Sequence, residues 1–210
     1  MIKDTFFSFS RFGKLCRKEI LENWKLYTLR TSMMYGVLAI ALIWVGCSEY
    51  KSYNPLYSFD ELNVHVTTLV IWMWAWWGFV CLGTSLAFES MKSKPRRITN
   101  LMLPASTFEK FFLHWLIYVL ILPLLIYFFM ILADYTRVLI CSMVYSEIPS
   151  IEPTQFKYFV DQGDGGYSLC RNWSQGILLI SLNLYVQSLF LLGSIFWSKN
   201  TFLKTLISLV

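Results

Sequence analysis

The side chains best suited to binding a partner lie together in residues 89–110, ESMKSKPRRITNLMLPASTFEK. This segment carries cations at Lys92, Lys94, Arg96, Arg97 and Lys110, and its carboxylates are Glu89 and Glu109. It also contains two prolines, which restrict the backbone. A basic segment with a restricted backbone is a natural docking surface.

The same segment predicts its own local structure. Pro95 suits the first turn of a helix, so residues 95–102 are predicted to form about two helical turns. Pro104 ends that helix, because proline disfavours helical geometry in the residue before it. Ser106 and Glu109 then match a capping box, in which each side chain bonds to the backbone N–H of the other. A new helix is therefore predicted to begin here.

Residues 89–110 lie between two of four apolar stretches. The stretches are 31–47, 66–88, 111–133 and 176–197, and every Lys, Arg, Asp and Glu falls outside them. About 20 apolar residues are needed to cross a bilayer as a helix. A composition of 56% hydrophobic and 15% charged residues likewise indicates that lipid is the main solvent. The sequence predicts an all-α polytopic membrane helix bundle, with residues 31–210 as the transmembrane domain.

The apolar residues 201–210 are predicted to start a further span, and we expect at least one more span beyond Val210. The family resemblance described below leads to the same expectation.

Basic residues predict the orientation of the chain. Residues 1–30 hold seven, 89–110 hold five and 198–204 hold two, whereas 48–65 hold one and 134–175 hold three. By the positive-inside tendency, the N-terminus and the 89–110 loop face the cytoplasm. The first 30 residues lack the short apolar core of a secretory signal peptide.

Residues 1–30 are predicted to form an amphipathic helix in the cytoplasm or at the membrane interface. Apolar residues recur every three or four positions, at Phe9, Phe12, Cys16, Ile20, Trp24 and Tyr27. A basic helix of this kind lies on an anionic leaflet. A cytosolic helix packed on the protein's own loops is the alternative.

Residues 134–175 are predicted to lie outside. Their first part continues the third span as a helix, with Asp134 and Arg137 one turn apart, and two prolines then end it. Cys141 and Cys170 belong to this segment, and the sequence leaves their disulfide state open.

The run SMKSKPRRITNLMLPASTFEKFFLHWL resembles the loop of permease subunits of type-2 ABC exporters, particularly small permeases of Bacteroidetes with a similar LMLPAS…EKF signature. The local match covers about 30 residues, and the match in hydropathy and topology covers the whole chain. The family usually has six spans, whereas this chain shows four and the start of a fifth. In that family a basic N-terminal helix lies along the inner leaflet.

The resemblance implies that a short coupling helix between the second and third spans contacts a separate ATPase subunit. The residues implied in this coupling loop are Lys92, Lys94, Arg96, Arg97, Leu101, Met102, Pro104, Ser106 and Glu109. The implied partners are the ABC ATPase, a second permease copy or paralogue, and the lipid of a bacterial inner membrane. No GxxxxGK[ST] phosphate loop occurs, so ATP would act through the partner and no catalytic residue, metal or cofactor is expected.

Polar residues within the spans are the remaining candidates for function. Thr84, Ser85, Asn183 and Gln187 are predicted to make hydrogen bonds between helices or to line a substrate pathway. Nucleic acid is not an expected partner, because the basic residues flank spans. The transported substrate is left open.

Two other classes of function remain open. One is a membrane sensor or assembly scaffold whose basic loop docks another cytosolic protein. The other is an integral membrane enzyme, which would need an acid, base or nucleophile clustered at one depth. The spans offer only hydroxyls, amides and the boundary residue His114.

Overall fold

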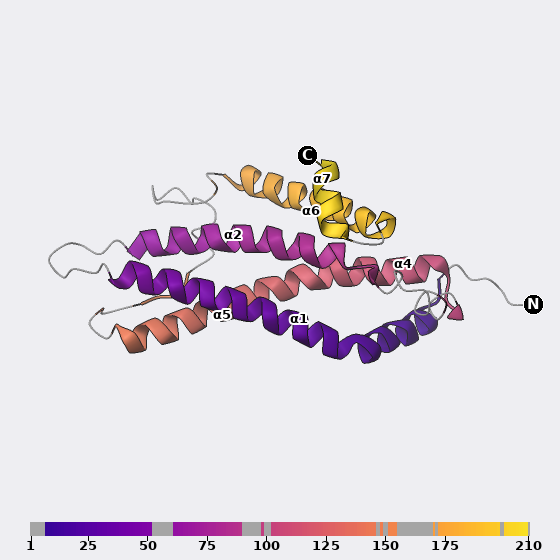
Figure 1. Cartoon of the computed structure of the whole chain (residues 1–210), viewed down its shortest axis with the longest axis horizontal. Helices are drawn as coiled ribbons and strands as arrows, with labels where there is room; N and C mark the ends of the chain where they lie inside the picture. The colour runs from indigo at the N-terminus through magenta and orange to yellow at the C-terminus, as the bar shows by residue number, and fades with distance from the viewer. Residues whose placement is uncertain are drawn as a thin grey trace, which may run out of the picture. The chain divides into compact units, whose positions relative to one another are not determined.

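The computed structural model describes residues 7–51, 61–89, 98, 102–145, 148, 151–154, 170, 172–197 and 200–209. Their regular elements, in the chain order seen in Figure 1, are α1 (Phe9–Lys51), α2 (Glu61–Ser85), α4 (Thr107–Trp115), η2 (Leu116–Ile121), α5 (Leu122–Val144), α6 (Trp173–Phe196) and α7 (Thr201–Leu209). The predicted all-α helical bundle is confirmed.

Four helices of the described chain are long and apolar enough to cross a membrane. They are Phe9–Lys51, Val64–Ser85, Thr107–Val144 and Trp173–Phe196. Large apolar side chains on these helices point away from the protein, as at Trp44, Trp74 and Leu124, which are 77%, 70% and 68% exposed. Apolar surface of this extent requires an apolar surrounding. The chain is therefore a multi-pass membrane protein.

Helix α1 includes two segments that the sequence predicts to be separate elements. An amphipathic region was predicted over residues 1–30 and a span over 31–47, whereas α1 runs through both without a break. No proline precedes Pro55, so nothing in the sequence interrupts the helix. Its 43 residues extend about 65 Å, roughly twice the thickness of a bilayer core. The helix is thus long enough to include one span and a comparable length outside it.

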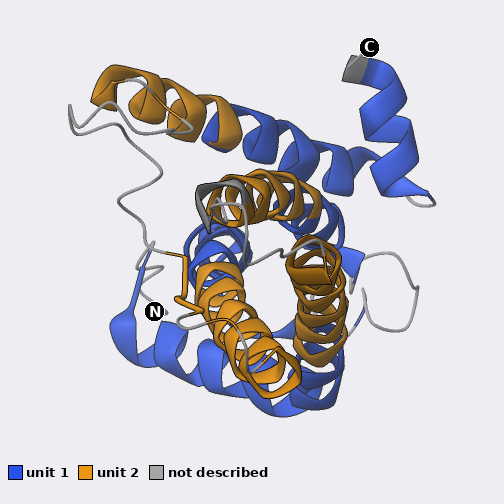
Figure 2. Ribbon diagram, turned by 90° about the vertical axis from the view of Figure 1, so that its left-hand side faces the viewer, with its two compact units in different colours: residues 1–30, 79–124, 184–210 blue, residues 31–78, 125–183 orange. Residues whose placement is uncertain are grey.

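The chain divides into two compact units, coloured in Figure 2. Unit 1 comprises residues 1–30, 79–124 and 184–210, and unit 2 comprises residues 31–78 and 125–183. The buried cluster of unit 1 contains Ala87, Phe88, Tyr118 and Leu191. That of unit 2 contains Tyr50, Val64, Cys141 and Ile148.

The third apolar stretch lies in one long helix composed of α4, η2 and α5. The prediction that helix continues beyond residue 133 is confirmed, because α5 ends only at Val144. Its middle element, η2, is a π-helix, in which each backbone N–H bonds five residues back instead of four. Such an element inside an α-helix needs a physical cause.

Pro123, two residues beyond η2, accounts for this irregularity. The Leu122 N–H makes the π-type bond to the Ile117 carbonyl, and the next such bond would join position 123 to the Tyr118 carbonyl. Proline has no N–H to donate. The Nε2 atom of Gln187 donates to that carbonyl instead, at 2.8 Å. Gln187 of α6 therefore supplies the hydrogen bond that the Tyr118 carbonyl does not receive from position 123. An apolar surrounding requires such a partner, because no water is present to replace it.

Helices α6 and α7 approach closely at a glycine. A Cβ added at Gly193 would lie 2.1 Å from Thr205 Oγ1 and 3.0 Å from Thr205 Cβ, so no side chain fits there. Asn200 precedes α7 with a φ of 53°, a left-handed conformation that asparagine tolerates better than most residues. The two residues together account for the tight turn back onto α6.

Replacing Gln187 by Leu should lower the free energy of unfolding by about 1 kcal/mol, because the Tyr118 carbonyl loses its donor in an apolar interior. The cost should shrink in a Pro123→Ala background, where the alanine N–H can bond the same carbonyl. Reversible denaturation in detergent micelles measures both values. Equal costs in the two backgrounds would contradict this account of η2.

Candidate functional site

The predicted capping box is present at the start of α4. The Glu109 N–H donates to Ser106 Oγ at 3.2 Å, and the Ser106 N–H donates to Glu109 Oε2 at 3.0 Å. Ser106 has the extended backbone of an N-cap residue, with φ −66° and ψ 153°. The end of the basic loop is thereby fixed to the beginning of the third membrane helix.

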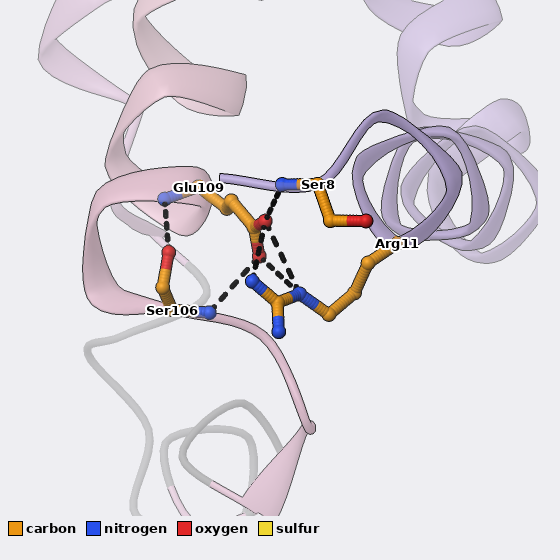
Figure 3. Close-up of polar contacts among 4 residues, drawn as sticks. All are labelled: Ser8, Arg11, Ser106 and Glu109. Carbon is orange, nitrogen blue, oxygen red and sulfur yellow. Dashed lines mark hydrogen bonds and ion pairs between the residues drawn. The ribbon is translucent and has the colours of Figure 1, made fainter. Parts of the chain in front are cut away.

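Glu109 also binds the N-terminal segment, a contact that the sequence did not predict. Arg11 donates through Nε at 2.9 Å to Oε2 and through Nη2 at 2.9 Å to Oε1, and the Ser8 N–H donates to Oε1 at 2.9 Å. Figure 3 shows these donors converging on one carboxylate from separate segments. The Glu109 side chain is fully buried. Its negative charge is therefore neutralised by Arg11 and its oxygens are occupied by backbone and guanidinium N–H groups.

Aromatic side chains pack beside this carboxylate. The rings of Phe12 and Phe112 lie 5.6 Å apart, centre to centre, and join α1 to α4. Phe112 also stacks on Phe108 at 5.7 Å and on Trp115 at 5.8 Å. Packing of this kind helps to enclose the Glu109 carboxylate, whereas Arg11 remains 32% exposed.

A second ion pair holds the other end of the loop. Arg30 Nη2 donates to Glu89 Oε2, which follows the last turn of α2. The Arg30 and Glu89 side chains are 30% and 45% exposed, whereas Arg11 is 32% exposed and Glu109 is fully buried. The Arg30–Glu89 pair is therefore weaker and more sensitive to salt, because its carboxylate is in contact with solvent. Both ends of the 89–110 loop are nevertheless bound to the same helix, α1.

The loop itself is described only in part. Lys92, Lys94, Arg96, Arg97 and Leu101 lie outside the described residues, as does most of the helix predicted over 95–102. Two described residues of that helix, Ile98 and Met102, are helical and are 55% and 80% exposed. Pro104 is exposed, and a tight turn around it brings the Ala105 N–H 2.8 Å from the Leu103 carbonyl.

The predicted polar residues of the spans divide into three kinds. Gln187 makes the predicted bond between helices, to the Tyr118 carbonyl. Thr84 and Ser85 instead donate within α2, to carbonyls three or four residues earlier. Asn183 is buried, and its Nδ2 atom has no partner in the described chain.

A buried charged network in unit 2 was only partly predicted. Arg137 is fully buried and donates to Asp134 Oδ1 at 2.8 Å, so the expected one-turn pairing is confirmed. It also donates to the Tyr50 hydroxyl at 2.9 Å and to the Glu152 carbonyl at 3.3 Å. The second oxygen of Asp134 accepts from the Thr154 N–H at 2.6 Å.

In this network Arg137 of α5 is hydrogen-bonded both to α1 and to the segment after α5. The sequence placed Asp134 and Arg137 in an external helix, and it contained no signal that both would be enclosed by protein. Tyr50 lies 87 residues from Arg137 and shows no local pattern that predicts the bond. Cys141 is a free thiol.

Comparison with known proteins adds no relative to these observations. No protein-family model, curated protein or solved structure matches this chain. The site is therefore interpreted from its own geometry.

Glu109→Gln should lower the free energy of unfolding by about 3 kcal/mol, because Arg11 loses its anionic partner and the amide cannot accept from every donor. Ser106→Ala removes only the cap and should cost about 1 kcal/mol. Denaturation in micelles measures both, with the exposed Lys14→Gln as a control. If Glu109→Gln costs no more than Ser106→Ala, the Arg11 contact contributes nothing.

Arg137→Met should destabilise the protein by about 4 kcal/mol, because Asp134 would remain buried without a cation. The double variant Arg137→Met, Asp134→Asn should cost less than the sum of its single changes. Arg17→Met, on the exposed surface of α1, provides the matched control. Additive costs in the double variant would show that the two charges do not interact.

Proposed function

We propose that this chain is the membrane-spanning permease subunit of an ABC exporter in a bacterial inner membrane, with its N-terminus in the cytoplasm. A separate ATPase subunit binds the 89–110 loop, and a second permease copy or paralogue completes the transporter. The observation that carries the proposal is the attachment of both loop ends to α1, through Arg30 with Glu89 and Arg11 with Glu109. Force applied to such a loop is transmitted to helices rather than absorbed by bending of the connection.

The two attachments differ in strength, and this difference directs the force. The Glu109 carboxylate is fully buried with four N–H donors, whereas the Arg30–Glu89 pair is partly exposed. Movement of the loop therefore acts first on α4, at the start of the third span. Eight residues beyond α4, Pro123 follows the π-helix η2. Bending is easiest at such a position, which makes η2 a candidate for the element with two conformations that coupling requires.

The described part of the loop has a surface suited to a protein partner. Ile98 and Met102 expose apolar side chains within a segment whose sequence also includes five cations. Exposed apolar side chains are typical of protein interfaces. A sensor or assembly scaffold that docks another cytosolic protein would use the same surface, so the identity of the partner distinguishes the two functions.

Photo-crosslinking tests the identity of the partner. A benzophenone amino acid at Met102 or Ile98 should form a covalent adduct with an ABC ATPase subunit when the two proteins are co-expressed. The same amino acid at Trp44, which is exposed on a membrane span, is the control and should give no ATPase adduct. Mass spectrometry of the adducts identifies the partner.

A second measurement tests coupling. Arg11→Gln should leave the ATPase bound but lower the ATPase rate of the purified complex several-fold, because the loop loses its stronger attachment. Adducts with a different cytosolic protein would favour the scaffold, and labelling of Met102 from outside the cell would overturn the orientation. An unchanged ATPase rate in Arg11→Gln would argue against coupling through this attachment.

A further inference from the structure

A small cavity in unit 1 contains polar groups that the proposed function does not use. It lies where α1, the end of the basic loop and α4 meet, and it has a volume of about 20 Å³. Its lining residues are Leu15, Lys18, Glu19, Leu103, Lys110, Leu113 and His114. A space of this size accommodates one group as large as a water oxygen.

The first of these polar groups is a buried histidine. His114 is 5% exposed, and its Nδ1 atom has no hydrogen-bond partner in the described structure. An enclosed ring nitrogen without a partner is costly, so an occupant of the cavity that can bond to it is favoured. Because Nδ1 of a neutral imidazole can carry the proton, the occupant can be an acceptor.

Two lysines contribute the charge of the cavity. Lys18 Nζ lies 3.6 Å from Oε1 of the exposed residue Glu22, a distance typical of a weak surface ion pair. Lys110 has no carboxylate within ion-pair distance in the described part of the chain, because its neighbour Glu109 is engaged by Arg11. Two ammonium groups on one small cavity repel each other unless an anion lies between them.

The remaining charged group on the cavity does not neutralise the lysines fully. Glu19 Oε1 accepts from Asn23 Nδ2 at 2.8 Å and from the Tyr27 hydroxyl at 3.2 Å, so this carboxylate is already held within α1. Among the side chains that line the cavity, the two lysines and Glu19 leave one net positive charge, whereas Glu22, which pairs with Lys18, is not part of the lining. The cavity therefore favours a small anionic group over water.

A neighbouring cavity provides a comparison within the same unit. It also borders Glu19 and His114, but its cation is Arg30, which is paired with Glu89. Both cavities border the histidine, but of the two only the cavity beside Lys18 and Lys110 also borders a lysine that has no carboxylate within ion-pair distance in the described part of the chain. An anion is therefore expected there and not in the second cavity.

Phosphate is the anion whose shape fits this arrangement. One non-bridging oxygen fills the cavity and accepts from His114 Nδ1–H, while the rest of the group lies at the opening between the two ammonium groups. The exposed face of the same part of α1 carries Ile20, Leu21 and Trp24 together with Arg17. Apolar and cationic side chains on one face are typical of helices at a bilayer surface, where the most abundant phosphates belong to lipids.

We infer that the cavity bordered by Lys18, Lys110 and His114 binds the phosphate of an anionic glycerophospholipid. Lys18 and Lys110 attract the charge, and the enclosed histidine distinguishes an oxygen that enters the cavity from one held loosely at the surface. The site can be tested in the chain without an ATPase, so its failure is distinguishable from failure of the proposed permease function.

Native mass spectrometry of the full chain tests the site. The protein is incorporated into nanodiscs of phosphatidylcholine with phosphatidylglycerol, transferred to detergent and measured for retained phosphatidylglycerol. Lys110→Gln should reduce retention about tenfold, because a charge-assisted contact is lost. Lys14→Gln removes the same charge from the exposed face of α1 and should change retention little. Thermal unfolding of each variant verifies that it is folded.

Further measurements distinguish the source of the phosphate and the role of the histidine. Titration with inorganic phosphate should displace retained phosphatidylglycerol from the native chain only at high concentration, and His114→Leu should lose retention that His114→Gln partly restores. Tight binding of inorganic phosphate without lipid retention would keep the phosphate site but overturn the lipid assignment. Equal retention in Lys110→Gln and Lys14→Gln, or no binding of either phosphate, would overturn the site.

Discussion

A polar group enclosed by apolar surroundings must find its partner within the protein, and much of this structure follows from that constraint. The Glu109 carboxylate is fully buried and bonds to Arg11, Ser8 and Ser106. Arg137 is equally enclosed and is satisfied by Asp134 and by groups from other segments. In water each partner would be replaceable by solvent, whereas in a membrane protein each bond selects one arrangement of the chain.

The same constraint applies to the backbone, and here it produces an irregular helix. Pro123 leaves the Tyr118 carbonyl without its donor, and Gln187 supplies one from α6. The third span is therefore interrupted at a place where a neighbouring helix both permits and stabilises the interruption. The two ion pairs on α1 hold the start of the third span in place, whereas η2 makes the middle of that span easier to bend. That combination suits a helix that must transmit a movement begun in the loop.

Local patterns in the sequence predicted the elements well. The capping box involves two residues three positions apart, and hydrogen-bond geometry within one turn determines it, so Ser106 and Glu109 were recognisable without a fold. The lengths of the membrane helices followed from the long apolar runs, of which the third contains Pro123 and includes the π-helix η2. Residues 1–30 and the first span were predicted as separate regions, and α1 runs through both, because the change from mixed to apolar composition does not break its backbone hydrogen bonds.

By itself, the sequence determined the helices, the apolar lengths that cross a membrane and the cap of α4, because each depends on residues within a few turns of one another. Only the tertiary structure decided which polar side chains from distant segments bind one another. Arg11 is 98 residues from Glu109, Arg30 is 59 from Glu89 and Tyr50 is 87 from Arg137. Side chains at such separations meet only when helices pack, and the spacing of residues along the chain does not predict which helix faces will pack together.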